Sequence, residues 1–128
     1  MNLEILKKKS SNNIEVAVWA EKKQYYHIAI SRYYYSEFQK IIYISKKLGF
    51  YKKPEATNNS HGLTIQEFVE SMKDKLTDEQ KITILRMNRL KKLRNKADYD
   101  EIDFVQNDYN LSFKFYLNEI QEITNGFL

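Results

Sequence analysis

The pattern of apolar and polar positions in the first half of the chain predicts two helices. Apolar side chains recur through residues 2–21 on either side of the polar run Ser10-Ser11-Asn12-Asn13, so we expect a helix there, with a break near this run left open. Residues 21–24 form a polar junction. Residues 25–48 repeat apolar side chains at threes and fours, which predicts a long central helix ending at Gly49.

The second half carries start and stop signals for further helices. Residues 50–62 contain the proline and a polar run, which predicts a loop. Thr64 and Glu67 have the spacing of a capping box, so we expect a short helix from there to about residue 76. Thr77 and Gln80 repeat the device before a helix from 78 to about 98. A last helix is expected from after residue 103 to about 125.

These elements predict an all-α fold, an antiparallel bundle of four main helices plus one short helix. The chain of 128 residues suffices for one core and is too short for two, so residues 1–128 are expected to form a single domain. Three glycines and one proline offer few turn positions, which argues against a many-stranded sheet.

The composition excludes several kinds of chemistry. There are no cysteines, and neither His27 nor His61 has a metal-ligand pattern around it, so we expect no metal site and no cofactor. We interpret both histidines as structural. No apolar run is long enough to span a bilayer, and charges occupy the place where a signal peptide needs its apolar segment. A cytoplasmic protein without membrane association is therefore expected.

Positive charge is concentrated in one segment. The formal net charge of +4 only permits an acidic partner. Six bases without an intervening acid lie between residues 86 and 96: Arg86, Arg89, Lys91, Lys92, Arg94 and Lys96. The plain alternative for such a run is a solvated helix face. On that interpretation Arg94 and Asp98, four residues apart, form an ion pair along one helix.

The triplet Tyr33-Tyr34-Tyr35 lies in the expected central helix. Successive helical residues point about 100° apart, so these three rings cannot all face the core. An exposed tyrosine ring can stack on a nucleic-acid base or lie in a subunit interface. We favour core or interface positions for the triplet.

Three segments together resemble the HEPN superfamily: SRYYYSEFQKI at 31–41, SHGLTIQEF at 60–68 and LRNKADYD at 93–100. The chain looks closest to small bacterial HEPN proteins with an Arg…Ala-Asp-Tyr motif, and the likeness covers nearly its whole length. The resemblance implies a helical bundle that pairs into a symmetric homodimer, with the arginine motifs facing each other across a cleft. Many members are metal-independent ribonucleases of toxin–antitoxin, phage-defence or CRISPR-linked systems.

The resemblance also implies roles for residues of the motif. Catalytic members carry a histidine separated from the arginine by four to six residues, a window that here contains Tyr99, Asp100 and Glu101. An ordinary aspartate, with a pKa near 3.9, is a poor proton shuttle at neutral pH. The candidate catalytic residues are Arg94, Asp98 and Tyr99. The candidate RNA-binding residues are Arg86, Arg89, Lys92, Asn95 and Lys96.

Three functional hypotheses follow. The first is an RNA-directed protein of a toxin–antitoxin or defence system, partnered by an antitoxin or another defence protein, in which cleavage of RNA is an open question. The second is a catalytically inactive HEPN-like module that binds a protein partner through its aromatic surface. The third is nucleotide binding by the same basic cleft.

Overall fold

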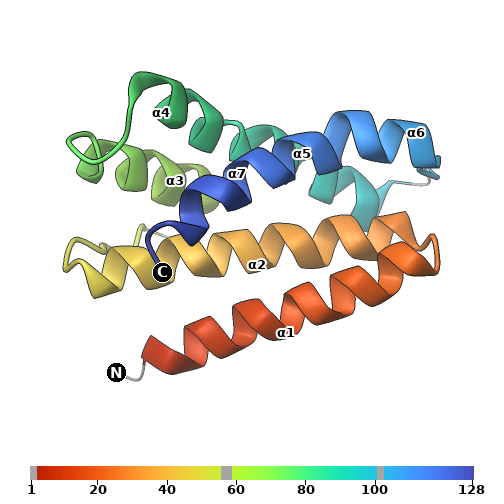
Figure 1. Ribbon diagram of the computed structural model, residues 1–128, viewed down its shortest axis with the longest axis horizontal. Helices are drawn as coiled ribbons and strands as arrows, with labels where there is room; N and C mark the ends of the chain where they lie inside the picture. Colours follow the sequence, from red (N-terminus) through yellow and green to blue (C-terminus); the bar gives the residue numbers. More distant parts are fainter. Residues whose placement is uncertain (1–2, 56–58, 101–102) are drawn as a thin grey trace.

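The computed structural model describes residues 3–55, 59–100 and 103–128, and these residues form helices joined by turns, without a strand among them (Figure 1). The all-α prediction is confirmed. The elements are α1 (Leu3–Lys22), α2 (Tyr26–Lys47), α3 (Ser60–Ser71), α4 (Asp78–Leu85), α5 (Met87–Tyr99), α6 (Gln106–Tyr109), a π-helical turn η1 (Asn110–Lys114) and α7 (Phe115–Asn125).

Helix α2 is the central element of the bundle. It contacts α1, α3, α5 and α7, and Figure 1 shows it running between α1 on one side and the remaining helices on the other. Its apolar row is buried as the sequence predicts, with Ile30, Tyr34 and Ile41 fully inaccessible. Two polar residues of the same helix, Ser36 and Lys40, are buried too, because the helices packed against α2 cover them.

Paired contacts define the directions of the helices against α2. The α1–α2 pair runs in opposite directions, since Lys7 lies over Tyr43 whereas Asn13 bonds to Arg32. Helix α5 also runs opposite to α2. Arg94 contacts Tyr35, whereas Asp98, further along α5, contacts Ser31, which comes earlier in α2. The C-terminal helical stretch runs in the same direction as α2, because the contact pairs Tyr26–Tyr109, Tyr33–Phe113 and Lys40–Asn125 ascend together.

Helix α1 has no break at its polar run. Ser10 is buried against Ser36 of α2, and each hydroxyl donates to the other residue's carbonyl oxygen at 3.0 Å. The small polar side chain thus lets the two helices approach and satisfies its own hydrogen bond, so the helix continues through it. The positive φ of Gly49, 84°, confirms the expected end of α2.

The expected start of α3 is wrong. The helix begins at Ser60, four residues before the predicted cap, and Thr64 lies inside it with its hydroxyl donating to the Ser60 carbonyl at 3.0 Å. The helix then ends at Ser71 rather than near residue 76.

Two other helices differ from expectation in continuity. The stretch expected as one helix from 78 to 98 is divided at Arg86 into α4 and α5. The last helical stretch starts at Gln106 and contains the π-helical turn η1 before α7. No helix in the described residues is long and apolar enough to cross a membrane.

Candidate functional site around Arg94

Arg94 lies on α5 with its guanidinium held against α2. Its Nη1 donates a hydrogen bond to the Tyr35 hydroxyl at 3.0 Å. The guanidinium carbon is 5.1 Å from the ring centroid of Tyr35 and 5.4 Å from that of Tyr34, within cation–π distance of both. The side chain is only 11% exposed. Arg94 is therefore oriented by aromatic rings rather than freely solvated.

A second contact of Arg94 is the ion pair that the sequence spacing allows. Nη1 lies 3.5 Å from the Asp98 carboxylate, which also accepts a hydrogen bond from Ser31 of α2 at 3.5 Å. The Nε atom of Arg94 is buried and has no hydrogen-bond partner among the described residues. The guanidinium thus keeps one donor unused, which an acceptor reaching this position would satisfy.

His61 joins this cluster from the first turn of α3. Its Nδ1 is 2.9 Å from the Tyr34 hydroxyl, and its ring stacks on Phe38 with the centroids 4.0 Å apart and an interplanar angle of 17°. Burial lowers the pKa of His61, and the positive charges of Arg94 and Lys91 lower it further. The imidazole is therefore neutral at pH 7.

Burial of Tyr34 determines which ring nitrogen of the neutral His61 imidazole carries the proton. Tyr34 is fully inaccessible, so its hydroxyl has no solvent to donate to, and burial raises the pKa of the phenol. The hydroxyl therefore stays protonated and donates a hydrogen bond to Nδ1 of His61, which is its partner in the structure. The ring proton of His61 is then on Nε2, which makes this nitrogen a hydrogen-bond donor.

The basic residues predicted for RNA binding fall into two groups. Arg86 and Arg89 lie over the ring of Tyr116 in α7, and Arg89 also donates to the Tyr116 hydroxyl at 2.8 Å. Lys92, Asn95 and Lys96 are exposed on the outer side of α5. The predicted set therefore includes one group engaged with α7 and one that faces solvent.

The predicted catalytic residues are only partly brought together. Arg94 and Asp98 are in contact, whereas Tyr99 is 78% exposed and the rings beside Arg94 belong to Tyr34 and Tyr35. Glu101 lies outside the described residues.

Sequence reasoning missed the part of the cluster contributed by other helices. Tyr34, Tyr35 and His61 lie in segments that carry the family resemblance, but their spacing within each segment gave no sign that they meet Arg94. The available signal was the consecutive tyrosine pair, because adjacent helical positions place two rings around one partner. The described residues contain no group of three or more His, Cys, Asp or Glu side chains that could hold a metal ion.

Comparisons of the chain with protein-family models, curated proteins and solved structures found no match.

Proposed function

We propose that this protein binds RNA through α5 and the cluster around Arg94, as an RNA-directed, HEPN-like protein of a toxin–antitoxin, phage-defence or CRISPR-linked system. The observation that carries the proposal is the exposed basic side of α5, where Lys92 and Lys96 face solvent and no acidic residue interrupts residues 86–97. Cations of this kind bind the phosphate backbone and release its counterions. Arg94 adds a guanidinium on the α2-facing side of the same helix, and its unpaired Nε donor suits a phosphate oxygen.

Binding is the primary activity in this proposal, and cleavage is a further outcome to be measured. Two groups of the cluster could act as a general base, and both already have partners. Nδ1 of His61 is hydrogen-bonded to Tyr34, and the Asp98 carboxylate contacts Arg94 and Ser31. Proton abstraction from a ribose 2′-hydroxyl needs a base that is free to accept a proton. A metal-independent endoribonuclease would have to release one of these groups when RNA binds.

We further propose that two copies pair into a homodimer, as the resemblance implies, and that an antitoxin or other defence protein is a partner. Exposed apolar side chains support a protein interface. Leu111 is 65% exposed and lies near Arg89 and Tyr116, and Phe115 is 58% exposed and packs edge-on against Tyr116. Such side chains are compatible with an interaction surface.

The test is retention and cleavage of total RNA by the purified protein in EDTA, measured by filter binding and by gel. Lys92→Gln with Lys96→Gln should weaken binding and reduce the slope of log affinity against log salt by about 1.4, at roughly 0.7 per lost contact with a single strand. The matched control is Lys8→Gln with Lys9→Gln on α1, which removes the same two charges from an exposed site on the other side of α2. Equal loss in both double variants would mean that only net charge matters and would contradict an α5 site.

Arg94→Ala separates binding from cleavage once its helix content has been checked by circular dichroism. Loss of RNA fragments in this variant would establish cleavage at the cluster. Light scattering should give about twice the chain mass of 15.4 kDa for the homodimer.

The second candidate is the catalytically inactive module that binds a protein partner, which the exposed Leu111 and Phe115 favour. It predicts that the wild-type protein neither retains RNA at low salt nor cleaves it. In that case Phe115→Ser, and not Arg94→Ala, should abolish capture of the protein partner.

A further inference from the structure

A hollow of about 310 Å³ lies beside His61, between residues 51–54 and the first turn of α3. This volume is at the lower end of the range for small-molecule sites. Phe38, Ile42 and Pro54 supply apolar walls, and Tyr51 adds an aromatic ring. Nζ of Lys46, which does not line the hollow, lies 5.0 Å from the centroid of that ring and helps to orient it. The lining therefore suits a flat, partly apolar group.

Polar groups enter the same hollow from two elements. His61 lines it and, with Nδ1 engaged by Tyr34, offers its Nε2–H as a donor. Lys53 lines it from the segment before α3. Thr64 also lines the hollow, and because its hydroxyl donates to the Ser60 carbonyl, the hydroxyl oxygen remains an acceptor. These groups match the donors and acceptors of a nucleobase or its sugar phosphate.

The charges around the hollow favour an anion. Lys53 borders it directly, and Arg94 and Lys91 act electrostatically on His61 from the side of α5. Lys91 is fixed by donating to Asn59, the residue just before α3, at 2.9 Å. A phosphate beside His61 would lie in a positive potential that the proposed RNA surface of α5 continues.

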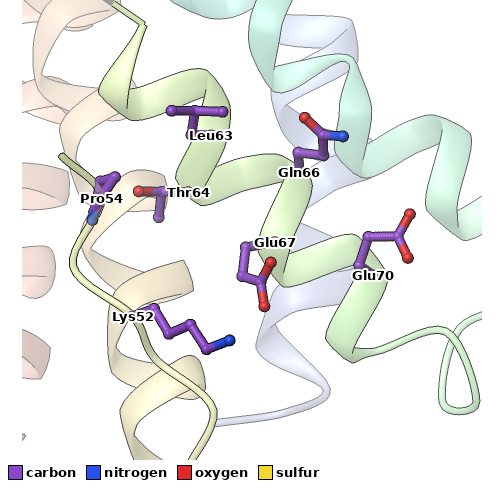
Figure 2. A pocket seen from close by; sticks show the side chains of 7 residues that line it. All are labelled: Lys52, Pro54, Leu63, Thr64, Gln66, Glu67 and Glu70. Atoms are coloured by element: carbon purple, nitrogen blue, oxygen red, sulfur yellow. The ribbon is translucent and has the colours of Figure 1, made fainter. Parts of the chain in front are cut away.

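A neighbouring hollow provides a contrast. It has about 340 Å³ and shares Pro54 and Thr64 with the first, but Figure 2 shows Glu67 and Glu70 projecting from α3 along its border. Two carboxylates repel a phosphate, and Lys52 compensates one of them at most. The hollow bordered by Glu67 and Glu70 is thus unsuited to a phosphate, whereas the hollow lined by Lys53 and His61 suits one.

From these observations we infer that the hollow lined by His61, Tyr51 and Lys53 binds a single nucleotide, with the base against the aromatic wall and the phosphate toward Lys53 and His61. The inference rests on the proposed function, because it names this nucleotide as one unit of the RNA strand bound along α5. The same chemistry would be offered by a free mononucleotide, so the test must include both.

The test titrates the protein with AMP, UMP and the hexanucleotides A6 and U6, using calorimetry and the His61 ring signals in NMR spectra. His61→Asn keeps an acceptor for the Tyr34 hydroxyl but removes the ring and its second nitrogen. This variant and Lys53→Gln are each expected to weaken hexanucleotide binding at least tenfold. The controls are His27→Asn, at an exposed histidine of α2, and Glu67→Gln in the acidic hollow, and neither should weaken binding.

The outcomes separate this inference from the proposed function. Hexanucleotide binding that is unchanged in His61→Asn and Lys53→Gln, but weakened by the α5 double variant, would overturn the nucleotide subsite and leave RNA binding in place. Binding of AMP or UMP without binding of either hexanucleotide would support the pocket and overturn RNA as its source. Absence of binding by all four probes would overturn both.

Discussion

At the scale of single residues, Glu37 and Lys40 on α2 form a buried ion pair. The carboxylate is fully inaccessible, and Lys40 Nζ lies 2.6 Å from it. Thr124 donates to the same carboxylate at 2.9 Å, and Asn125 accepts from Lys40 at 2.7 Å. Burial raises the pKa of Glu37, although Lys40 and Thr124 act in the opposite direction. The pair ties α2 to the C-terminal end of α7.

Removing the lysine should strongly destabilise the fold in a pH-dependent manner. Lys40→Met leaves a buried carboxylate without its cation, a change that costs about 3–5 kcal/mol at neutral pH. The folded-state pKa of Glu37 lies above its ordinary value of 4.5. The free energy of unfolding is therefore highest below pH 4.5, where Glu37 is protonated in both states, and it falls as the pH rises toward the folded-state pKa. The loss is at most about 1.4 kcal/mol per pH unit. Urea unfolding at pH 5 and pH 7 measures it.

The control for this experiment is the double variant Glu37→Gln with Lys40→Met. It has no ionisable group at the site, so its free energy of unfolding should lack the additional pH dependence of Lys40→Met. A loss in Lys40→Met that is the same at pH 5 and pH 7 would show that Glu37 is not the group responsible.

Residue spacing predicts contacts within one helix and fails for contacts between helices. The four-residue interval between Arg94 and Asp98 predicted their ion pair, which the structure contains. Tyr35 and His61 come from α2 and α3, and their approach to Arg94 depends on how three helices pack. The motif therefore identified the arginine, and only tertiary structure identified its neighbours.

At the scale of elements, two capping signals of similar sequence have different outcomes. Thr77 accepts from the Gln80 N–H at 3.1 Å, and the Gln80 side chain accepts from the Thr77 N–H at 2.9 Å, so the predicted capping box is confirmed. Thr64 has the same spacing to Glu67, yet α3 starts earlier, and in its first turn His61 stacks on Phe38. Packing of that turn against α2 extends the helix past the local signal.

The cap of α4 gives a prediction for a single element. Thr77→Ala removes the acceptor for the Gln80 N–H and should lower the free energy of unfolding by about 1 kcal/mol, within a range of roughly 0.5–2. Thr83→Ala is the matched control, because this threonine lies inside α4 and its hydroxyl donates to the Glu79 carbonyl. Alanine is the better helix former there, so the control should lose little or gain stability. Urea unfolding measures both, and equal losses would show that the cap contributes nothing specific.

At the scale of the whole molecule, α1 is attached to the bundle at two places. Along its length it packs on α2, where Ala17 and Ala20 are fully buried. Near its end, Glu21 accepts hydrogen bonds from Tyr109 and Lys114 of the C-terminal helical stretch. The first helix and the C-terminal helical stretch are thereby joined at one end of α2.

This attachment predicts that α1 unfolds together with the rest of the chain. Trp19, the one tryptophan of the sequence, lies on α1 and packs edge-on against Tyr25 with the centroids 5.7 Å apart. Its fluorescence therefore reports α1, whereas far-UV circular dichroism reports all helices. In a single cooperative domain the two urea transitions have the same midpoint and slope. Glu21→Gln weakens the second attachment and should shift both transitions together to lower urea. A fluorescence transition that precedes the loss of ellipticity would show that α1 is a separate unit docked on α2, because its contacts with the C-terminal stretch would then contribute too little to couple it to the core.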